Sequence, residues 1–130
     1  MQGDIICCSE TWLDSDMVTK ELEIESYNLY LNSVGKGNGL ATYFRETNTK
    51  IISYLQTNSF QITKMNAKNI DVISVYLSDR VNSSEVIDSF SKIIDSQETT
   101  ILCGDLNICY KQNINDPLIL ALKSKALINL

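Results

Sequence analysis

Five short segments between residues 27 and 77 constrain the fold of this chain more than any other feature. They are rich in Ile, Tyr, Val, Phe and Thr, and short polar breaks containing Asn, Ser, Lys or Gly separate them. Such a series is typical of antiparallel strands that follow one another as a meander. The predicted strands span residues 27–32, 39–46, 49–55, 59–65 and 70–77.

The N-terminal region predicts one more strand and a short helix. Residues 3–8, "GDIICC", form an apolar run without polar alternation, which suits a strand buried on both faces. We expect Asp14 or Ser15 to cap a helix that continues through residues 17–24.

The hydrophobic period changes after residue 80. In "NSSEVIDSFSKIIDSQ", residues 82–97, apolar side chains recur at helical spacing, and Asn82 with Glu85 three residues later has the spacing of a capping box. This pattern predicts an amphipathic helix whose apolar residues are Val86, Phe90, Ile93 and Ile94.

The C-terminal part predicts a strand and a second helix. Residues 99–104, "TTILCG", form the strand, and Pro117, a favoured first-turn residue, begins a helix over residues 117–127. Strands followed by helix, strand and helix predict an α/β (α+β) class, with helices packed against a largely antiparallel sheet. At 130 residues, without an internal repeat or linker, we expect one domain over residues 1–130.

Charge and composition limit the chemistry that is open to the chain. Eleven Lys and Arg stand against 16 Asp and Glu, so the net charge is −5, which argues against a protein that binds nucleic acid through a broad basic face. Phosphate-directed chemistry would therefore need a cation. Because the chain has no histidine, the reacting groups have to be carboxylates, amides and tyrosines.

The sequence carries no signal for a membrane or an oxidising compartment. No window of about 18 uninterrupted apolar residues exists, which argues against a membrane span. The N-terminus "MQGDIICCSE" lacks the basic segment and long apolar core of a secretory signal. We expect an intracellular location, nuclear or cytoplasmic, and no membrane partner.

The four cysteines are expected to be reduced and buried as apolar side chains. They are Cys7, Cys8, Cys103 and Cys109. Cys7 and Cys8 are neighbours in a predicted strand and should therefore point to opposite faces. A zinc site is the weaker alternative, because the spacing lacks the C-x2-C knuckle that is usual for such sites.

A cluster of glycines at positions 35, 37 and 39 invites comparison with a phosphate-binding loop. Such a loop lies between a strand and a helix N-terminus, whose free N–H groups hold the anion. Here the glycines precede a predicted strand, so we interpret them as a turn.

Four polar side chains lie at the ends of predicted strands and are candidates for chemistry: Glu10, Tyr76, Asp105 and Asn107. Asp105 and Asn107 are two residues apart, so in extended backbone both side chains would leave the same face. An aspartate activates water or binds a hard cation, and an asparagine bonds a phosphate oxygen without adding charge. The alternatives are a surface acid for Glu10, a half-buried core tyrosine for Tyr76, and a simple Asp/Asn turn.

Taken in order, four motifs resemble the endonuclease/exonuclease/phosphatase superfamily, and within it the endonuclease-like domains of non-LTR retrotransposons. They are "DIICCSETWL", "GLATYFRE", "DVISVYL" before the amphipathic helix, and "TILCGDLN" after it. The resemblance implies a four-layer α/β sandwich in which two mainly antiparallel sheets pack face to face between helices. It places the site at one edge of the pair of sheets.

The resemblance also implies a role for each candidate residue. Glu10 matches the glutamate that binds the catalytic Mg²⁺ or Mn²⁺, and Tyr76 matches a tyrosine that contacts the scissile phosphate. Asp105 matches the aspartate that orients or deprotonates the attacking water, and Asn107 matches the asparagine that holds the phosphate. The implied reaction is metal-dependent hydrolysis of a phosphoester, with nucleic acid as the substrate and DNA favoured over RNA.

In the superfamily a strand carrying an asparagine precedes the Glu10 motif, and later segments carry an aspartate and a histidine. None of these matches a part of the 130 residues, so we expect a partial sandwich, an incomplete domain cut at both ends, with little or no activity. One alternative is a non-catalytic retroelement-derived remnant that binds a partner or self-associates through exposed sheet edges. Another is an unrelated α/β domain with an accidental "GDLN".

Overall fold

The computed structural model describes residues 4–13, 19–33, 39–45, 49–94, 97–108 and 115–124. All five strands predicted between residues 27 and 77 are present, and so are both helices predicted after residue 80. The elements in chain order are β1 (Ile5–Ser9), the 3-10 helix η1 (Thr19–Leu22), β2 (Asn28–Asn32), β3 (Leu40–Phe44), β4 (Thr49–Gln56), β5 (Phe60–Ala67), β6 (Ile70–Leu77), α1 (Ser83–Ile93), β7 (Thr99–Asp105) and α2 (Pro117–Ser124).

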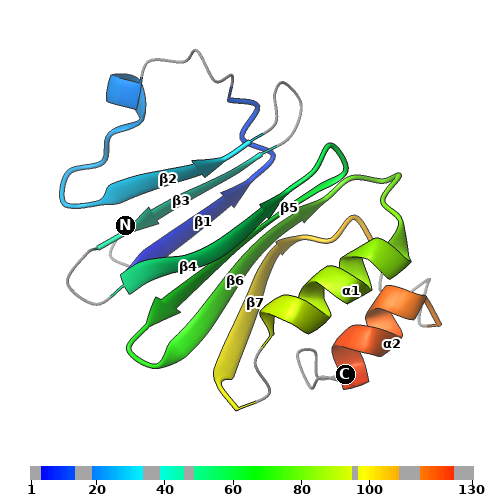
Figure 1. The fold of residues 1–130 in the computed structure, drawn as a ribbon. Helices are drawn as coiled ribbons and strands as arrows, with labels where there is room; N and C mark the ends of the chain where they lie inside the picture. The colour runs from blue at the N-terminus through cyan, green and yellow to red at the C-terminus, as the bar shows by residue number, and fades with distance from the viewer. Residues whose placement is uncertain are drawn as a thin grey trace.

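The strands form two sheets, which Figure 1 shows. The first has the order β1-β3-β2, and both neighbours run antiparallel to the central β3. The second has the order β4-β5-β6-β7, antiparallel except for the parallel pair β6 and β7. The expectation of one continuous meander is therefore wrong. Because β1 and β2 occupy both edges of β3, the chain starts a new sheet at β4.

The two sheets and the helices are stacked in layers (Figure 1). The first sheet packs on one face of the second, with β1 over β6 and β7 and with β3 over β5 and β6. The helices α1 and α2 cover the opposite face. The α/β sandwich of two mainly antiparallel sheets is thus confirmed, with both α-helices of the described residues on one side.

The helix-covered face of the second sheet holds the main apolar core. Side chains of β5 and β6 pack there against Val86 and Phe90 of α1 and against Leu118 and Leu122 of α2. Asn82 caps α1 as predicted, because its side-chain oxygen accepts from the Ser84 N–H at 3.0 Å. The strand residues of this core are Phe60, Ile62, Ile73, Val75 and Leu77.

The other face of the same sheet, which the first sheet covers, carries buried polar residues beside apolar ones such as Met65. Gln61, Thr63 and Ser74 are all fully buried there. Asn32 of β2 reaches across and donates to the Ile62 carbonyl oxygen and the Thr63 hydroxyl, both at 3.1 Å. This amide therefore ties the two sheets together through hydrogen bonds.

Two expectations about the N-terminal region are wrong. The helix predicted through residues 17–24 does not reach residue 24, because within the described residues it is the 3-10 helix η1, which ends at Leu22. Residues 14–18, which include the predicted caps Asp14 and Ser15, lie outside the described residues. The strand β1 is half-buried along its whole length instead of buried on both faces. Among the described residues it pairs only with β3, so it lies at a sheet edge.

The helices are short. Within the described ranges, no helix is long and apolar enough to span a membrane.

Candidate active site at the ends of β1, β6 and β7

Three strands deliver the candidate residues to one side of the molecule. The arrows of β1 and β7 point the same way in Figure 1, and β6 runs parallel to β7. Tyr76 of β6 is the register partner of Asp105 of β7, so the two residues lie side by side at the ends of neighbouring strands. Glu10 follows the last residue of β1.

Gly104 allows β7 to approach β6 closely just before this site. Its φ is +129°, a region that side chains rarely adopt. A Cβ built there would lie 1.9 Å from the Val75 carbonyl oxygen, so only glycine fits. The glycine of the "GDLN" motif thus sets the position of the aspartate that follows it.

Tyr76 is the point on which the acidic residues converge. Its side chain is 6% exposed. Burial raises the pKa of its phenol, and the negative charges of Glu10, Asp105 and Asp79 raise it further. Glu10, which follows β1, and Asp105 of β7 therefore lie near enough to Tyr76 of β6 for their charges to act on its phenol.

Asp105 and Asn107 form a tight turn as well as part of this cluster. The Asn107 N–H donates to the Asp105 carboxylate at 2.8 Å, and the Asn107 side chain donates to the Leu77 carbonyl oxygen at 2.5 Å. Because β7 ends at Asp105 and Asn107 has a φ of +49°, the expectation that both side chains leave one face of an extended strand is wrong. Asn107 instead turns toward the end of β6.

The loop after β1 holds Glu10 in an unusual backbone conformation. Its φ is +51°, which is costly for a residue other than glycine and is often found at functional sites. The N–H of Thr11 donates to the Gly39 carbonyl oxygen at 3.4 Å. A Cβ on Gly39 would lie 3.0 Å from the Thr11 hydroxyl, so this glycine makes room for the loop. Gly35 and Gly37 lie outside the described residues.

Asp79 is a further acidic residue at the site that the sequence analysis missed. It lies in the turn after β6 and is exposed. With Asn107, Ser78, Ser83 and Asp116 it lines a small cavity of about 240 Å³ at the end of β6 and β7. The same signal that identified Glu10, a carboxylate just past a buried strand, could have identified it.

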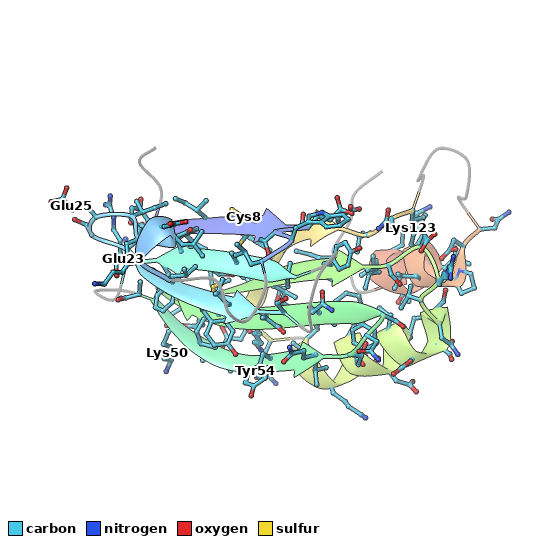
Figure 2. The ribbon with its side chains drawn as sticks, turned by 90° about the horizontal axis from the view of Figure 1, so that it is seen from above. Cys8, Glu23, Glu25, Lys50, Tyr54 and Lys123 are labelled. Carbon is cyan, nitrogen blue, oxygen red and sulfur yellow. The ribbon has the colours of Figure 1, made fainter. Side chains whose placement is uncertain are left out.

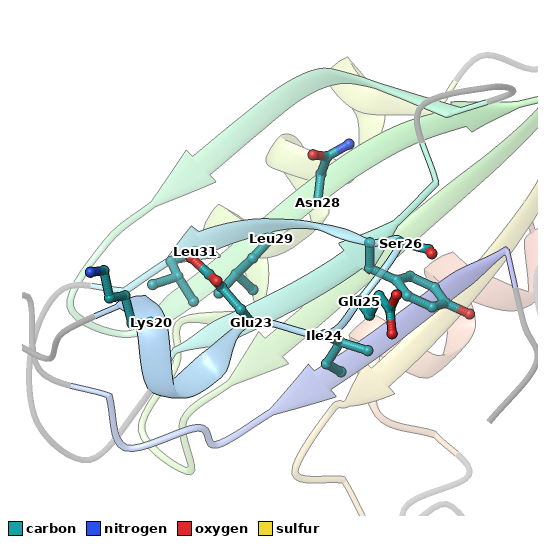
Figure 3. Close-up of a pocket in the computed structure, with 9 residues that line it drawn as sticks. Lys20, Glu23, Ile24, Glu25, Ser26, Asn28, Leu29 and Leu31 are labelled. Carbon is teal, nitrogen blue, oxygen red and sulfur yellow. The ribbon is translucent and has the colours of Figure 1, made fainter.

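A larger hollow, of about 770 Å³, lies elsewhere (Figure 3). The segment from η1 to β2 lines it, and none of the candidate residues does. Phe44 of β3 is the register partner of Ile5, at the start of β1, and of Asn28, at the start of β2. The hollow, which Asn28 lines, is therefore level with the start of β1. Glu10, in contrast, follows the end of β1. Figure 2 shows Glu23 and Glu25, which line the hollow, at the opposite end of the molecule from Lys123 of α2.

The donor atoms at the site suit a hard divalent cation. Carboxylate oxygens are the ligands that Mg²⁺ prefers, and it is usually held by one or two carboxylates together with water and substrate phosphate. Glu10 and Asp105 offer two such groups around Tyr76. The described residues contain no cluster of three or more potential ligands, so any such site would be this open kind.

The cysteines of the described residues are free thiols. Cys7 faces the second sheet, where a hydrogen bond with Cys103 and then burial raise its pKa. Burial also raises the pKa of Cys8. The hydrogen bond between Cys7 and Cys103 lowers the pKa of Cys103. These thiols do not belong to any group of three or more potential metal ligands among the described residues. Cys109 lies outside the described residues.

Comparison with known proteins gives a consistent result. No protein-family model matches the chain. An exodeoxyribonuclease of Bacillus subtilis (strain 168) is 27% identical over an alignment of 126 residues, and the match covers 85% of this chain and 49% of that enzyme. The chain therefore spans about half the length of this relative.

Solved structures share the fold at low sequence identity. An AP endonuclease from Archaeoglobus fulgidus superposes with a TM-score of 0.62 at 17% identity, covering 95% of this chain and 59% of that one. The human Nocturnin catalytic domain gives 0.58 at 15% identity, covering 89% and 57%. D. rerio TDP2, in complex with a single-strand DNA product, gives 0.57 at 16% identity, covering 86% and 51%. The chain therefore shares the fold of these proteins and is similar in sequence to the exodeoxyribonuclease, in agreement with the resemblance of its motifs to the endonuclease/exonuclease/phosphatase superfamily.

Proposed function

We propose that this chain is part of a metal-dependent phosphodiesterase that cleaves nucleic acid, with DNA favoured over RNA. The convergence of Glu10 and Asp105 on the buried Tyr76 carries this proposal. Three strands that are distant in sequence place an acid, a phenol and an acid together at one end of the sheets. Such groups can hold a cation and act on a phosphate.

In this proposal the metal is Mg²⁺ or Mn²⁺, and Glu10 is its principal protein ligand. The cation would supply the positive charge that the acidic chain lacks and so stabilise charge that develops on the phosphate. Asp105 orients the attacking water or takes its proton. The oxygen of that water then bonds to phosphorus while one phosphoester bond breaks.

Tyr76 and Asn107 serve as hydrogen-bond donors to the phosphate. Because burial and nearby negative charge raise the pKa of Tyr76, its hydroxyl keeps its proton at neutral pH and can donate it in a hydrogen bond. Asn107 has two amide N–H donors, of which one is held by the Leu77 carbonyl oxygen. The anchored amide is thereby oriented, and its second N–H is the one assigned to the phosphate.

The relatives support a nucleic-acid substrate. Their names describe an exodeoxyribonuclease, an AP endonuclease and a protein in complex with a single-strand DNA product. A retrotransposon origin stays a prediction, and so does the nuclear or cytoplasmic location. We further propose that residues 1–130 alone form an incomplete domain with little or no activity, because groups that act together lose most of the rate when some are missing.

Metal-dependent stabilisation tests the proposal without requiring turnover. Mg²⁺ that binds only the folded chain stabilises it by about 2.7 kcal/mol at a Mg²⁺ concentration of 100 times the Kd. This stabilisation must raise the Tm. We expect this shift in the wild type and its loss in Glu10→Gln and Asp105→Asn. Asp88→Asn, on the exposed face of α1, is the matched control and should keep the shift. An equal shift in all four proteins, or none in any, contradicts the proposed site.

A nicking assay on supercoiled and abasic plasmid tests the activity. We expect little or no Mg²⁺-dependent nicking by residues 1–130. Robust turnover that Asp105→Ala abolishes would overturn the inactivity while supporting the site.

A second proposal, a non-catalytic and self-associating remnant, has one observation in its favour. Among the described residues β4 pairs only with β5, so its other edge carries unpaired backbone groups. Ile52 and Tyr54 of this strand are also exposed. Light scattering at high protein concentration tests this second proposal. The wild type should form an oligomer, and Ile52→Lys should be monomeric. A stable wild-type monomer excludes the proposal.

A further inference from the structure

Trp12, two residues after Glu10, is the single tryptophan of the chain, and it is exposed. Its side chain is 64% accessible to solvent, the largest value among the exposed large apolar residues. A lone exposed apolar side chain is ordinary on a protein surface, so exposure by itself has no functional meaning. The backbone around Trp12 is what distinguishes it.

Trp12 is held outward by a strained and anchored loop. Its φ is +54°, and that of Glu10 is +51°, a left-handed conformation that is an outlier for a bulky residue. On one side the Thr11 N–H donates to the Gly39 carbonyl oxygen at 3.4 Å. On the other side the Ser33 hydroxyl donates to the Leu13 carbonyl oxygen at 3.3 Å. Strain of this kind persists only where the surroundings fix it, and here both flanking residues are fixed.

The backbone of Trp12 lies close to that of Glu10. Two residues of chain span at most about 7 Å, and the Glu10 charge acts on Tyr76. A side chain as long as that of Trp12 can therefore reach a ligand that extends from the site at Glu10 and Asp105.

The charge of the site determines what kind of contact a nucleic acid can make there. Glu10, Asp79 and Asp105 surround Tyr76, and the chain has a net charge of −5, so phosphate contacts to Lys and Arg cannot supply broad affinity. Stacking of a base on an aromatic ring needs no positive charge and contributes to binding of single strands. A base inside a duplex has both of its faces covered by its neighbours and is not available for such stacking.

We propose that Trp12 is a stacking platform for an unpaired nucleobase next to the phosphate bound at Glu10 and Asp105. The substrate is accordingly single-stranded or locally unpaired nucleic acid. This inference rests on the proposed function and adds the substrate class to it. Both DNA and RNA provide the required base, so the contact itself does not distinguish them.

Tyr54 provides a matched control. It is also an exposed aromatic residue, but it lies on β4, on the opposite side of the molecule from Cys8 of β1 in Figure 2. Its ring packs beside that of Tyr30 with the centroids 5.8 Å apart. A general affinity of exposed aromatic rings for nucleobases would involve Tyr54 as much as Trp12.

The single tryptophan makes the test direct, because all indole fluorescence of the chain reports on this position. We would titrate the wild type in Mg²⁺ with a thymidine oligonucleotide, with the same strand lacking its bases, and with a duplex. We expect saturable quenching by the single strand and at least a fivefold weaker response to the other two. With a labelled single strand, Trp12→Ala should raise the Kd about fivefold or more. Trp12→Phe should restore part of the affinity, and Tyr54→Ala should leave it unchanged.

The outcomes separate this inference from the proposed function. Equal quenching by strands with and without bases, an unchanged Kd in Trp12→Ala, or no binding of the single strand overturns the stacking platform. If Mg²⁺ still raises the Tm through Glu10 and Asp105 in any of these cases, the proposed metal site stands without it. Loss of the metal effect together with intact base-dependent quenching would instead remove the proposed function and leave a binding site for single strands.

Discussion

The two faces of the second sheet are built from the same strands but differ in the side chains that they bury and in the layer that covers them. Along β6, Ile73, Val75 and Leu77 point to the helices and form the apolar core. Ser74 and Tyr76 alternate with them and face the first sheet. One face is mainly an apolar contact, whereas the other carries several buried polar groups and ends at the candidate site.

This difference indicates where stability and function reside. Apolar burial is the main favourable term in folding, so the helix-covered face should contribute most of the stability. Buried polar atoms without a partner cost free energy, and the inter-sheet face includes Gln61 Oε1, Asn32 Oδ1 and Thr42 Oγ1 among them. We therefore expect mutations on the two faces to have opposite signs or very different sizes.

The largest effect should follow truncation in the apolar core. Phe90→Ala removes a fully buried ring between α1 and the sheet and should lower the free energy of unfolding by about 3 to 5 kcal/mol. Urea unfolding followed by circular dichroism measures it. The exposed neighbour Lys92→Ala is the control, with little change expected. A loss below about 1 kcal/mol for Phe90→Ala would break the comparison.

One ion pair lies at the margin of the apolar face, and removing its acid should have the next largest effect. The carboxylate of Asp71 is 2.7 Å from the Lys64 ammonium, and the Asn66 amide donates to it at 2.9 Å. Asp71→Ala leaves the half-buried Lys64 without this partner, so we expect a loss of about 3 kcal/mol.

The same pair makes stability depend on pH. Burial acts to raise the pKa of Asp71, but the bonds from Asn66 and Lys64 outweigh it and the pKa is lowered below the ordinary 3.8. A carboxylate with a lowered pKa adds stability above its ordinary pKa, and that stability is lost as the pH falls through the lowered value. Urea midpoints should therefore fall more steeply below about pH 4 in the wild type than in Asp71→Asn. Parallel curves would exclude this contribution.

Replacement of Gly104 should come next. Gly104→Ala forces a side chain into a left-handed backbone against the Val75 carbonyl oxygen, so we expect a loss of about 2 kcal/mol or more. Gly39→Ala is the matched comparison. Its φ is also positive, but the new Cβ would meet only side-chain atoms of Ser33 and Thr11, at 3.0 Å. Thermal melts in which Gly39→Ala is the more damaging change would contradict the close approach of β7 and β6.

The smallest effect should have the opposite sign. Thr42 is fully buried on β3, and its hydroxyl has no partner among the described residues. Thr42→Val replaces the hydroxyl with a methyl group of similar shape and should stabilise the fold by about 1 kcal/mol. A destabilised Thr42→Val protein would show that the inter-sheet hydroxyl is satisfied in solution, and the contrast between the two faces would be weaker.

Much of the fold was predictable because local patterns determine it. The five strands between residues 27 and 77, the Asn82 cap and the start of α2 at Pro117 are all where composition and spacing placed them. The division into two sheets was not predictable, because β3 pairs with β1 and β2 rather than with β4. Strand pairing depends on contacts between distant segments that no local period records.

The candidate site was predictable in part, for a similar reason. Glu10, Tyr76 and Asp105 follow from their positions at strand ends and from the family motifs. The left-handed backbone of Asn107 depends on its hydrogen bonds to Asp105 and Leu77, and the place of Asp79 beside Tyr76 depends on how the strands pack. Neither could be deduced from spacing alone.

Titration of the Tyr76 phenol tests the central claim most directly, because Glu10 and Asp105 must both lie near it. Tyrosine-labelled protein followed by NMR, with Tyr76→Phe to assign the signal, gives the pKa of this group. We expect a value above the ordinary 10.0 that falls in Glu10→Gln and again in Asp105→Asn. A Tyr76 pKa that neither substitution changes would contradict the convergence of these residues on one site.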